Sequence, residues 1–229
     1  MAWTHKDKMD LFIYCAGNLG KELITLAEII NGMEKKWDNI FFLDDVRQEK
    51  EFFHHAVYNY DEVLELKRRK NVQVAIANGE PRIRKILWDK LKKDGFDMAS
   101  LIYPSPFISE YAKIGKGVII REYCSVSMDV VIEDNVFVQT HASIGHDTRI
   151  GKHSIISSHV GIAGNCEVME QCYIGMGAMI KENLKIGEKT IIGISSSVFR
   201  NIKPSKIVVG NPAKIIGESE GSVFGMFKN

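Results

Sequence analysis

The sequence predicts an α/β front domain followed by an all-β rod of stacked coils, and three observations carry this prediction. Aliphatic residues recur at every sixth position through the second half of the chain. Strand-like and helix-like patterns alternate in the first half. Pro104 and Pro106, which disfavour a continuous helix or strand ladder, separate the two patterns. We therefore expect a front domain over residues 1–103, a rod over 104–216 and a short tail over 217–229.

The front domain begins with a strand, a glycine turn and a helix. Residues 11–15 (LFIYC) form an apolar run of strand length, and residues 21–36 place apolar side chains at helical spacing. The turn between them, residues 16–20, reads AGNLG. Such a turn leads into a helix N-terminus, where backbone N–H groups can bind an anion. On its own, this short glycine pattern is also typical of a packing turn.

Two further strands complete the pattern. Residues 40–45 (IFFLDD) end in Asp44 and Asp45, and residues 72–77 (VQVAIA) precede a helix near residues 81–93. This alternation predicts a Rossmann-like βαβ arrangement. The two aspartates follow the glycine turn by about 25 residues, a spacing that favours nucleotide binding. Too few residues precede the repeats for a complete dinucleotide-dependent dehydrogenase.

The rod is predicted by an unbroken repeat. Ile or Val occupies sixteen consecutive positions at a period of six, from Ile108 to Val198. The residue four places later is Ala, Val, Cys, Thr or Ser in fourteen of the sixteen cases, the exceptions being Leu184 and Ile202. An even period places both residues on the inner side of short strands, whereas an α-helix cannot keep that register. Three strands per coil would stack each aliphatic residue on its counterpart eighteen residues away and fill a triangular interior.

Three of the four cysteines occupy the small-residue position of this repeat, namely Cys124, Cys166 and Cys172, and the fourth is Cys15. The sequence has no CxxC pair, and the chain is long enough to fold without disulfide bonds. We therefore expect four small buried thiols and neither a disulfide nor a metal site.

Charge balance and hydropathy narrow the range of partners. Thirty basic and 29 acidic residues leave a formal net charge of +1, so no global field favours nucleic acid or an anionic membrane surface. The first ten residues are largely polar, and no segment approaches the roughly 20 consecutive apolar residues of a membrane span. We expect a cytoplasmic protein with a small, locally recognised ligand.

Short strings in the rod resemble the hexapeptide-repeat family of acyltransferases. They read IGKGVI, IGKHSI, IGMGAM and IGEKTI, and VVGNPAKII (residues 208–216) is similar to the motif that closes the rod in that family. The resemblance covers residues 102–216 and implies a left-handed parallel β-helix, an exception to the usual right-handed crossover. It also implies a homotrimer, which suits a prism whose flat faces need covering.

Taken with its front domain, the chain resembles bacterial sugar acetyltransferases related to sialic acid O-acetyltransferases and to the bacillosamine-pathway N-acetyltransferase. The resemblance implies transfer of acetyl from acetyl-CoA to an amino group of a nucleotide-linked amino sugar, without a metal. In these enzymes the front domain holds the nucleotide. By the same resemblance Gly17, Asn18 and Gly20 would approach ribose or phosphate. Asp44 and Asp45 would contact the base or the ribose.

A catalytic base is indicated in the string VQTHASIGHDTRIG (residues 138–151), which resembles the family segment that carries the catalytic histidine. That histidine aligns with His146, and Asp147 takes the place of its acidic partner. Acyl transfer needs a neutral amine, so a base must take a proton as the new bond forms. An imidazole, with an unperturbed pKa near ~6.5, suits that task, and a carboxylate can orient the ring. Because adjacent strand residues face opposite ways, the pair requires a corner that turns both outward.

One coil beyond His146 the sequence places Gly164, whose N–H is a candidate donor to the oxyanion of the thioester. A simple turn glycine is the alternative. By resemblance Gln139 and Thr140 lie near the acceptor, although the family has Asn at the first of these positions. Coenzyme A is expected in the groove between neighbouring rods. Candidate contacts to it are Gly164, Ile162, Lys181, Arg200, Lys203 and Lys214.

The other histidines receive weaker assignments. His141 and His159 differ by eighteen residues and should stack on adjacent coils, either as a paired site or as a surface ladder. A second histidine, which some relatives carry nine residues after the base, is Ile155 here. The histidines outside the repeat lie in polar company, where a solvated role is expected; these are His5, His54 and His55.

Other functions stay open from the sequence. An O-acetyltransferase acting on a sugar hydroxyl would share every motif, and a non-catalytic scaffold that binds a nucleotide sugar would make His146 dispensable. A zinc hydratase resembling γ-type carbonic anhydrases needs three histidines. His141 and His146 have the required five-residue step, but Ser105 stands at the third position. A uridylyltransferase is disfavoured, because the front domain is short and lacks a glycine- and arginine-rich phosphate loop.

Overall fold

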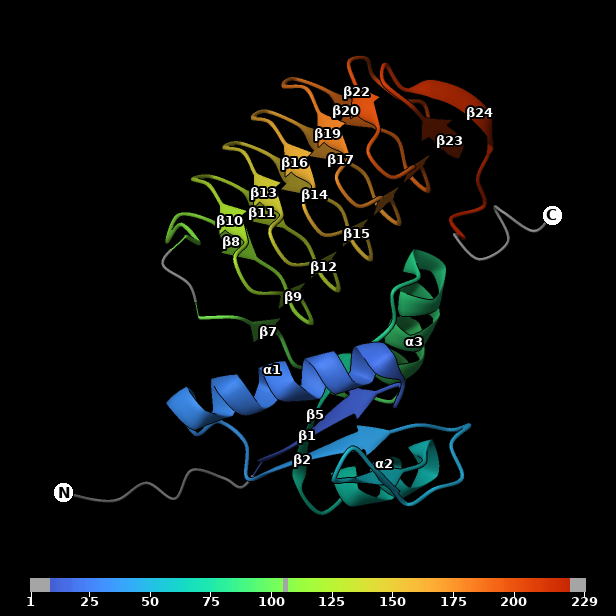
Figure 1. Cartoon of the computed structure of the whole chain (residues 1–229). Coiled ribbons are helices and arrows are strands. Elements are labelled where there is room, and N and C mark those ends of the chain that lie inside the picture. Colours follow the sequence, from blue (N-terminus) through green and yellow to red (C-terminus); the bar gives the residue numbers. More distant parts are fainter. Residues whose placement is uncertain (1–8, 105–106, 223–229) are drawn as a thin grey trace.

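The chain folds into an α/β front domain and a parallel β-helix that lies beside it (Figure 1). This computed structural model describes residues 9–104 and 107–222. The predicted fold class is confirmed, and the β-helix is left-handed. The predicted domain boundary falls partly on residues 105–106 and the predicted tail partly on residues 223–229, which lie outside the described ranges. The domain limits therefore stay predictions.

The front domain contains a six-stranded sheet in the order β3-β4-β2-β1-β5-β6. Its elements are β1 (Met9–Tyr14), α1 (Asn18–Glu34), β2 (Asn39–Leu43), β3 (Glu51–Phe52), β4 (His55–Tyr58), α2 (Tyr60–Lys67), β5 (Asn71–Ile76), α3 (Pro81–Lys93) and β6 (Asp97–Met98). Every pairing is parallel apart from the β3–β4 hairpin. The predicted strands and helices are present as β1, β2, β5, α1 and α3, whereas the hairpin, α2 and β6 were not predicted.

The elements that the sequence did not predict are short. Strands β3 and β6 contain two residues each, too few for a period to show. Helix α2 spans eight residues and begins with a capping box. In it, the Asn59 side chain accepts from the Glu62 N–H at 2.9 Å and the Glu62 carboxylate accepts from the Asn59 N–H at 2.8 Å. A local cap therefore starts this helix, not a long apolar periodicity.

The β-helix consists mainly of two-residue strands, arranged in three sheets that form its three faces. Face 1 contains β7 (Leu101–Ile102), β9 (Ile119–Ile120), β12 (Phe137–Val138), β15 (Ile155–Ile156), β18 (Tyr173–Ile174), β21 (Ile191–Ile192), β23 (Lys206–Val209) and β24 (Lys214–Glu218). Face 2 contains β10 (Ser125–Val126), β13 (Ser143–Ile144), β16 (Gly161–Ile162), β19 (Met179–Ile180) and β22 (Ser197–Val198). Face 3 contains β8 (Lys113–Ile114), β11 (Val131–Ile132), β14 (Arg149–Ile150), β17 (Glu167–Val168) and β20 (Lys185–Ile186). Each coil turns at three corners, which we name corner 1–2, corner 2–3 and corner 3–1 after the faces they join.

The periodic aliphatic residues fill the interior, as predicted. From Ile108 to Ile180, each pairs in register with its counterpart eighteen residues on, as Ile144 does with Ile162. From Val118 to Ala178 the small-residue position is also buried, and each of its hydroxyls and thiols donates to a backbone carbonyl fifteen residues later. Thr148 Oγ1, for example, donates to the Ala163 carbonyl at 3.1 Å. The same bond is made by Cys124, Ser154, Cys166 and Cys172.

All four cysteines are free. The three in the repeat are buried, as expected, and burial raises the pKa of the Cys124 thiol to about 11 and that of Cys172 to about 12. Cys15 lies just after β1 and is only half-buried, which differs from the expectation. These thiols are therefore protonated and unreactive at neutral pH.

A left-handed backbone residue forms each corner from Gly117 to Ser195. There the residue three places after a periodic aliphatic residue has a positive φ, as in His141 (62°), Asp147 (56°) and His153 (61°). Asn, Asp and His adopt this conformation more readily than most other residues. The turn interrupts the alternation of a strand, so residues that are adjacent in sequence can both point outward.

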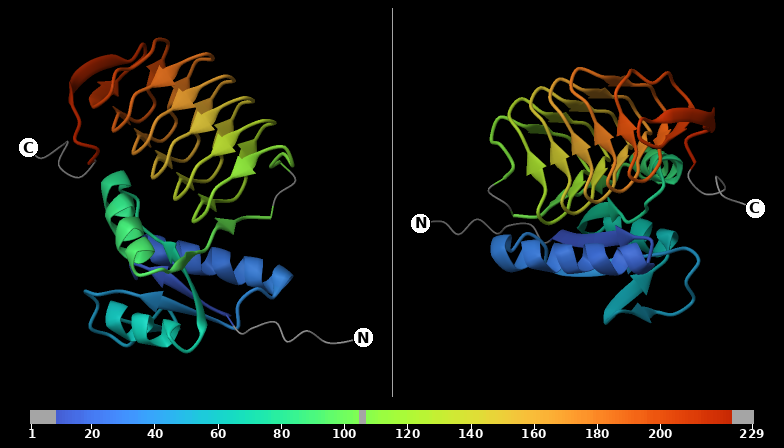
Figure 2. Two further views of the ribbon diagram at one scale, coloured as in Figure 1. Left: turned by 180° about the vertical axis from the view of Figure 1, so that it is seen from behind. Right: turned by 45° about the horizontal axis from the view of Figure 1, so that its top comes forward.

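The front domain covers face 1 (Figure 2). The outward residues of this face belong to the same hydrophobic cluster as the buried side of α1. They are Ile119, Phe137, Ile155 and Tyr173. Ile155, where some relatives carry a second histidine, is therefore a core residue between the domains. Because the prism is triangular, corner 2–3 is the corner that lies opposite the front domain.

A buried polar joint fixes α3 to corner 3–1. The fully buried Arg84 donates to the Ile76 carbonyl at 2.8 Å and to Asn135 Oδ1 at 2.7 Å. Asn135 donates from Nδ2 to His153 Nδ1 at 2.9 Å, so the ring is neutral with its proton on Nε2. Burial, followed by the positive charges of Lys85 and Arg84, lowers the pKa of His153 to about 4. This repeat histidine is thus part of the interface between the domains.

Candidate active site

His146 and Asp147 lie side by side at corner 2–3, between β13 and β14. The positive φ of Asp147 turns both side chains outward, with 55% and 53% of their surfaces exposed. His146 Nδ1 lies 2.8 Å from Asp147 Oδ2. Because a carboxylate can only accept, Nδ1–H donates a hydrogen bond to it. In the neutral ring, the Nε2 lone pair then stays free. The corner therefore turns both side chains outward, as a base and its acidic partner require.

Gly164 lies against the His146 ring, one coil further along the rod. A Cβ at this position would lie 2.6 Å from His146 Nε2, so a glycine is needed for the ring to rest there. Gly145 also packs closely against Gly164, because a Cβ added to Gly145 would lie 2.6 Å from the Gly164 nitrogen. The Gly164 N–H donates to no acceptor within the parts of the chain that the structure describes. The site thus combines an exposed base with a backbone donor beside it.

The residues expected to contact coenzyme A do not form one group. Ile162 is 3% exposed and its side chain lies inside the prism, so any contact with the cofactor would be made by its backbone. Lys181 lies at corner 2–3, as His146 does, and its Nζ is 3.6 Å from a Glu182 oxygen. Lys214 is exposed at the start of β24. Lys181 is therefore the predicted lysine that shares a corner with the base.

The glycine turn lies at the carboxyl end of β1, where the strand order reverses between β1 and β5. In open α/β sheets, ligands bind at such a switch point. Gly17 is the N-cap of α1 without a side-chain cap, and Asn18 begins the helix, so the first N–H groups face the turn. Gly20 has a packing role, because an added Cβ would lie 2.4 Å from the Cys15 carbonyl oxygen.

Asp44 holds the loop after β2 against the glycine turn. Its Oδ2 accepts from the Ala16 N–H at 2.7 Å, and its Oδ1 accepts from the Val46 and Arg47 N–H groups at 2.8 and 2.9 Å. The Arg47 guanidinium donates to the Ala16 carbonyl at 3.0 Å and lies 3.8 Å from the centre of the Phe52 ring. Asp44 therefore shapes the predicted nucleotide site through backbone contacts.

Asp45 belongs to a neighbouring polar cluster. It accepts from the Tyr14 hydroxyl at 2.7 Å and from the Tyr60 N–H at 2.9 Å, and Lys90 Nζ lies 3.3 Å away. Partial burial acts to raise the pKa of Asp45, but these hydrogen bonds and the Lys90 charge outweigh it and hold the pKa below its usual value. The carboxylate is thus ionised and already hydrogen-bonded.

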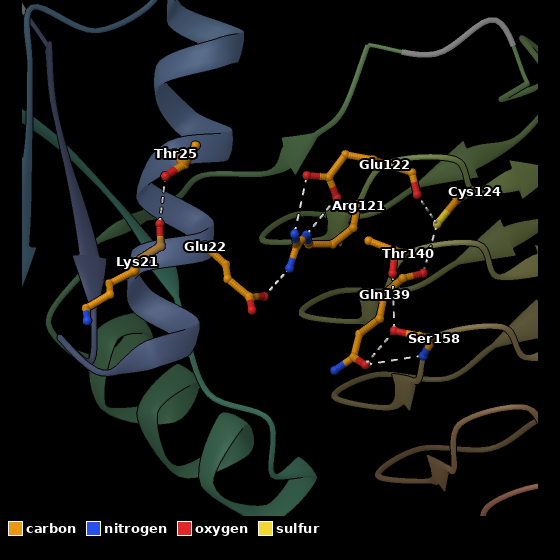
Figure 3. Close-up of polar contacts among 9 residues, drawn as sticks. All are labelled: Lys21, Glu22, Thr25, Arg121, Glu122, Cys124, Gln139, Thr140 and Ser158. Carbon is orange, nitrogen blue, oxygen red and sulfur yellow. Dashed lines mark hydrogen bonds and ion pairs between the residues drawn. The ribbon is translucent and has the colours of Figure 1, made fainter. Parts of the chain in front are cut away.

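Gln139 and Thr140 lie at corner 1–2 and not at corner 2–3 (Figure 3). Gln139 Oε1 accepts from the Ser158 N–H at 3.2 Å, and Thr140 Oγ1 donates to Ser158 Oγ at 3.2 Å. Strand β13 of face 2 separates them from His146. Within one chain, the predicted acceptor residues and the predicted base therefore occupy different corners of the same coil.

His55, His141 and His159 lie away from corner 2–3. His141 and His159 stack at corner 1–2 as predicted, with ring centres 4.7 Å apart, and Tyr123 extends the stack at 4.9 Å. His55 is not solvated as expected, because it is half-buried and its Nε2 lies 3.2 Å from a Glu28 oxygen. His5 lies outside the described residues.

A zinc hydratase site would need a third ligand in addition to His141 and His146. Between residues 9 and 104, and between 107 and 222, no group of three or more His, Cys, Asp or Glu side chains could hold a metal ion. Ser105, which stands at the third ligand position, lies outside these ranges.

In the same ranges, no helix has the length and apolar character needed to cross a membrane.

The sequence reasoning missed the charged residues beside Gln139 and Thr140. Arg121 and Glu122 lie at corner 1–2 one coil earlier, and Arg121 pairs with Glu22 of α1. The available signal was the spacing, since Arg121 precedes Gln139 by the eighteen residues of a coil. No signal in one sequence marked Glu22 as its partner, because that contact depends on how the domains dock.

The fold and these residues define a class of two-domain protein. A model of the PglD N-terminal domain matches residues 10–91. A model of the bacterial transferase hexapeptide (six repeats) matches residues 129–164. The chain thus joins a PglD-type front domain to a hexapeptide-repeat β-helix, and the resemblance to sugar acetyltransferases drawn from the sequence is confirmed.

Solved structures of acetyltransferases are similar over nearly the whole chain. The acetyltransferase domain of PglB from Neisseria gonorrhoeae is 28% identical, with a TM-score of 0.83 over 90% of this chain and 99% of that one. The same domain in complex with acetyl coenzyme A is 27% identical, with a TM-score of 0.84 over 91% and 100%. PerB from Caulobacter crescentus, in complex with CoA and GDP-perosamine, is 26% identical, with a TM-score of 0.82 over 91% and 97%. No curated protein matches the sequence significantly.

Proposed function

We propose that the protein is an acetyl-CoA-dependent acetyltransferase that acetylates an amino group of a nucleotide-linked amino sugar. The observation that carries the proposal is the exposed His146–Asp147 pair resting against Gly164. The similar structure that contains acetyl coenzyme A supports the donor. The similar structure that contains CoA and GDP-perosamine supports an amino sugar as the acceptor.

The reaction is a direct transfer. The acceptor amine attacks the thioester carbon, a C–N bond forms, and the C–S bond breaks as coenzyme A leaves. His146 Nε2 takes the proton of the amine and returns it to the departing sulfur. Asp147 keeps the other ring proton on Nδ1 and stabilises the imidazolium. The Gly164 N–H donates to the oxyanion, so no covalent acetyl-enzyme is required.

The nucleotide lies in the front domain, at the carboxyl ends of β1 and β2. Gly17 and Asn18 offer the N–H groups at the start of α1 to the ribose or phosphate. Asp44 and Asp45 border this position, and Asp44 orders its loop through three backbone N–H groups. Gln139 contacts the sugar through its amide NH₂ group. Its amide oxygen accepts from the Ser158 N–H, and the NH₂ group points away from Ser158.

We further propose a homotrimer, because the two halves of the site lie on different corners of one chain. Packing face 2 against a neighbouring subunit would bring corner 1–2 of one chain beside corner 2–3 of the next. Acetyl-CoA would then occupy the groove between the two rods, with Lys181 beside it.

The outward side chains of face 2 suit such packing. All are uncharged and most are small; they are Ser125, Ser143, Gly161, Met179 and Ser197. Face 3 differs, because it carries ion pairs such as Arg149–Glu133 and Lys185–Glu167. Burying charged pairs is costly, whereas small uncharged side chains allow close approach of two rods.

The first test is a screen of UDP-, GDP- and CMP-linked amino sugars with acetyl-CoA, in which released coenzyme A is detected as free thiol. We expect thiol release with at least one of them and a product that mass spectrometry identifies as the N-acetyl sugar. Release with sugar hydroxyl acceptors alone would make the protein an O-acetyltransferase. Parallel-line kinetics with a trapped acetyl-enzyme would contradict direct transfer.

The second test replaces the base. His146→Ala should lower kcat by about 10² to 10⁴, the usual contribution of a general base, while the affinity for the nucleotide sugar stays unchanged. His54→Ala, at an exposed position in the front domain, is the control and should keep full activity. Full activity of His146→Ala would favour a different base, and binding without any turnover by the wild type would favour the scaffold.

A further inference from the structure

Arg121 joins the two domains at corner 1–2 (Figure 3). Its guanidinium donates from Nε to Glu122 at 2.9 Å and pairs through a second nitrogen with Glu22 of α1. The Arg121 side chain is only 15% exposed and that of Glu122 only 22%, whereas Glu22 is 54% exposed. The guanidinium is therefore held on the β-helix by one carboxylate and reaches across the domain boundary to the other.

This contact lies between the two ends of the proposed nucleotide-sugar site. On α1, Glu22 follows Asn18 by four residues, which places the two on one side of the helix, one turn apart. On the β-helix, Arg121 lies one coil below Gln139, and its N–H donates to the Val138 carbonyl at 2.9 Å. Arg121 thus ties the first turns of the nucleotide-binding helix to the coil corner that carries Gln139.

The charges make this contact more than a surface ion pair. One guanidinium lies between two carboxylates, so its removal would leave Glu22 and Glu122 facing each other unneutralised. Although partial burial acts to raise the pKa of Glu122, Arg121 outweighs it and holds that pKa below its usual value, so the carboxylate stays charged. Loss of Arg121 would therefore replace attraction across the boundary with repulsion.

We propose that Arg121 is a positioning residue, which holds the start of α1 at a fixed distance from corner 1–2 so that a nucleotide bound to the front domain presents its sugar at Gln139. The inference rests on the proposed function and deepens it. A nucleotide sugar spans both domains, so its binding depends on their separation. A free nucleotide contacts only the front domain and does not depend on it.

The test compares Arg121→Met with the wild type, using the most active nucleotide sugar from the screen and its free nucleotide. We expect the KM for the nucleotide sugar to rise about tenfold, which corresponds to a coupling of about 1.4 kcal/mol. The Kd of the free nucleotide and the KM for acetyl-CoA should stay unchanged. Arg149→Met is the matched control, because Arg149 also pairs with a glutamate of the β-helix but lies on face 3.

Two outcomes would overturn the proposal. An unchanged KM for the nucleotide sugar would mean that Arg121 forms only a surface ion pair. An equal loss of affinity for the free nucleotide would make it a direct ligand of the nucleotide. Inactivity of the wild type with every nucleotide sugar would instead reject the proposed function itself, so the two failures are distinguishable.

A second variant protects the test against misfolding. Glu22→Gln removes the exposed partner and leaves the Arg121–Glu122 pair intact, so we expect normal folding with a smaller rise of the same KM. If both residues act through one contact, the Arg121→Met, Glu22→Gln double variant should be no worse than Arg121→Met alone. Additive losses would contradict a shared positioning role, and recovery of KM by Arg121→Lys would support it.

Discussion

Asp147 adopts a left-handed backbone conformation, and this single feature brings two consecutive side chains together (φ 56°). The sequence located His146 and Asp147 but could not place them on the same side, because strand alternation separates neighbours. The corner position follows from the period of six, since the chain turns at the third residue after a periodic Ile or Val. A prediction that allowed for a left-handed residue at each corner would have placed the two side chains together.

The role of Asp147 can be tested against an aspartate in the same setting. Asp147→Asn should lower kcat at least tenfold, because an amide can donate to Nδ1 and shift the ring proton to Nε2, where the lone pair is needed. Asp129→Asn is the control, because Asp129 has the same φ of 56° at the same corner one coil earlier. Steady-state kinetics of the two variants would decide, and equal kcat values would remove Asp147 from the mechanism.

Gly164 offers a second test at this scale. Gly164→Ala would place a methyl group 2.6 Å from the present position of His146 Nε2, so the exposed ring must move. We expect kcat to fall by about 10² or more, as when an oxyanion donor or its geometry is lost, with little change in the free energy of unfolding. Gly32→Ala, where an added Cβ meets nothing within 4 Å, should leave kcat unchanged. Wild-type kcat in Gly164→Ala would show that the ring position is unimportant.

At the scale of elements, the sequence predicted the coils well because their pattern has no interruptions. It did not predict which face receives the front domain, although a signal was present. The residue before each periodic Ile or Val is large and apolar on face 1, as at Phe137, and small in all but one coil of face 2, as at Ser143. The docking of α3 had no comparable signal, because a buried Arg84 resembles any helical arginine in the sequence.

The joint between α3 and corner 3–1 should make stability depend on pH. The pKa of His153 is about 4 in the fold and near ~6.5 when unfolded, so the unfolded chain binds the extra proton between these values. The contribution of His153 to the free energy of unfolding is therefore fully present above pH about 6.5 and is lost as the pH falls towards 4. The groups that face the ring include the cations Lys85, Arg84 and Lys152, which oppose its charge, and Asp89, which favours it.

His153→Gln should flatten this dependence, because a glutamine can accept the bond from Asn135 but does not titrate. We expect the loss of unfolding free energy between pH 7 and pH 5, measured with urea, to be smaller in His153→Gln than in the wild type. His54→Gln, at an exposed position, is the control and should retain the wild-type slope. Identical slopes in all three proteins would mean that His153 does not govern the acid limb.

At the scale of the whole molecule, the sequence grouped residues that one chain keeps apart. Gln139 and His146 are seven residues apart, and the family resemblance assigned both to the acceptor site, yet face 2 lies between them. Sequence distance along a coil does not translate into spatial proximity, because six residues carry the chain to another face. The proposed trimer resolves this separation by pairing the corners of different subunits.

Mixing two inactive variants tests that arrangement. One carries His146→Ala, and the other carries both Gln139→Ala and Thr140→Ala. In randomly mixed trimers about a quarter of the interfaces would combine an intact His146 with an intact corner 1–2 from the neighbour, so about a quarter of wild-type activity should return. Sedimentation should give three chains per particle. A mixture that stays inactive after subunit exchange would place the whole site within one chain.

The eighteen-residue coil also governs how such a rod can change in length. Between Ile108 and Val198 every coil is the same size, so deleting or adding one whole coil leaves each later side chain on its original face. A change of six residues would instead rotate everything downstream by one face. Beyond that point the serine-rich, the charged and the apolar surfaces would each move on to the neighbouring face of the prism. The β-helix can therefore be lengthened or shortened without changing its faces only by whole coils of three strands.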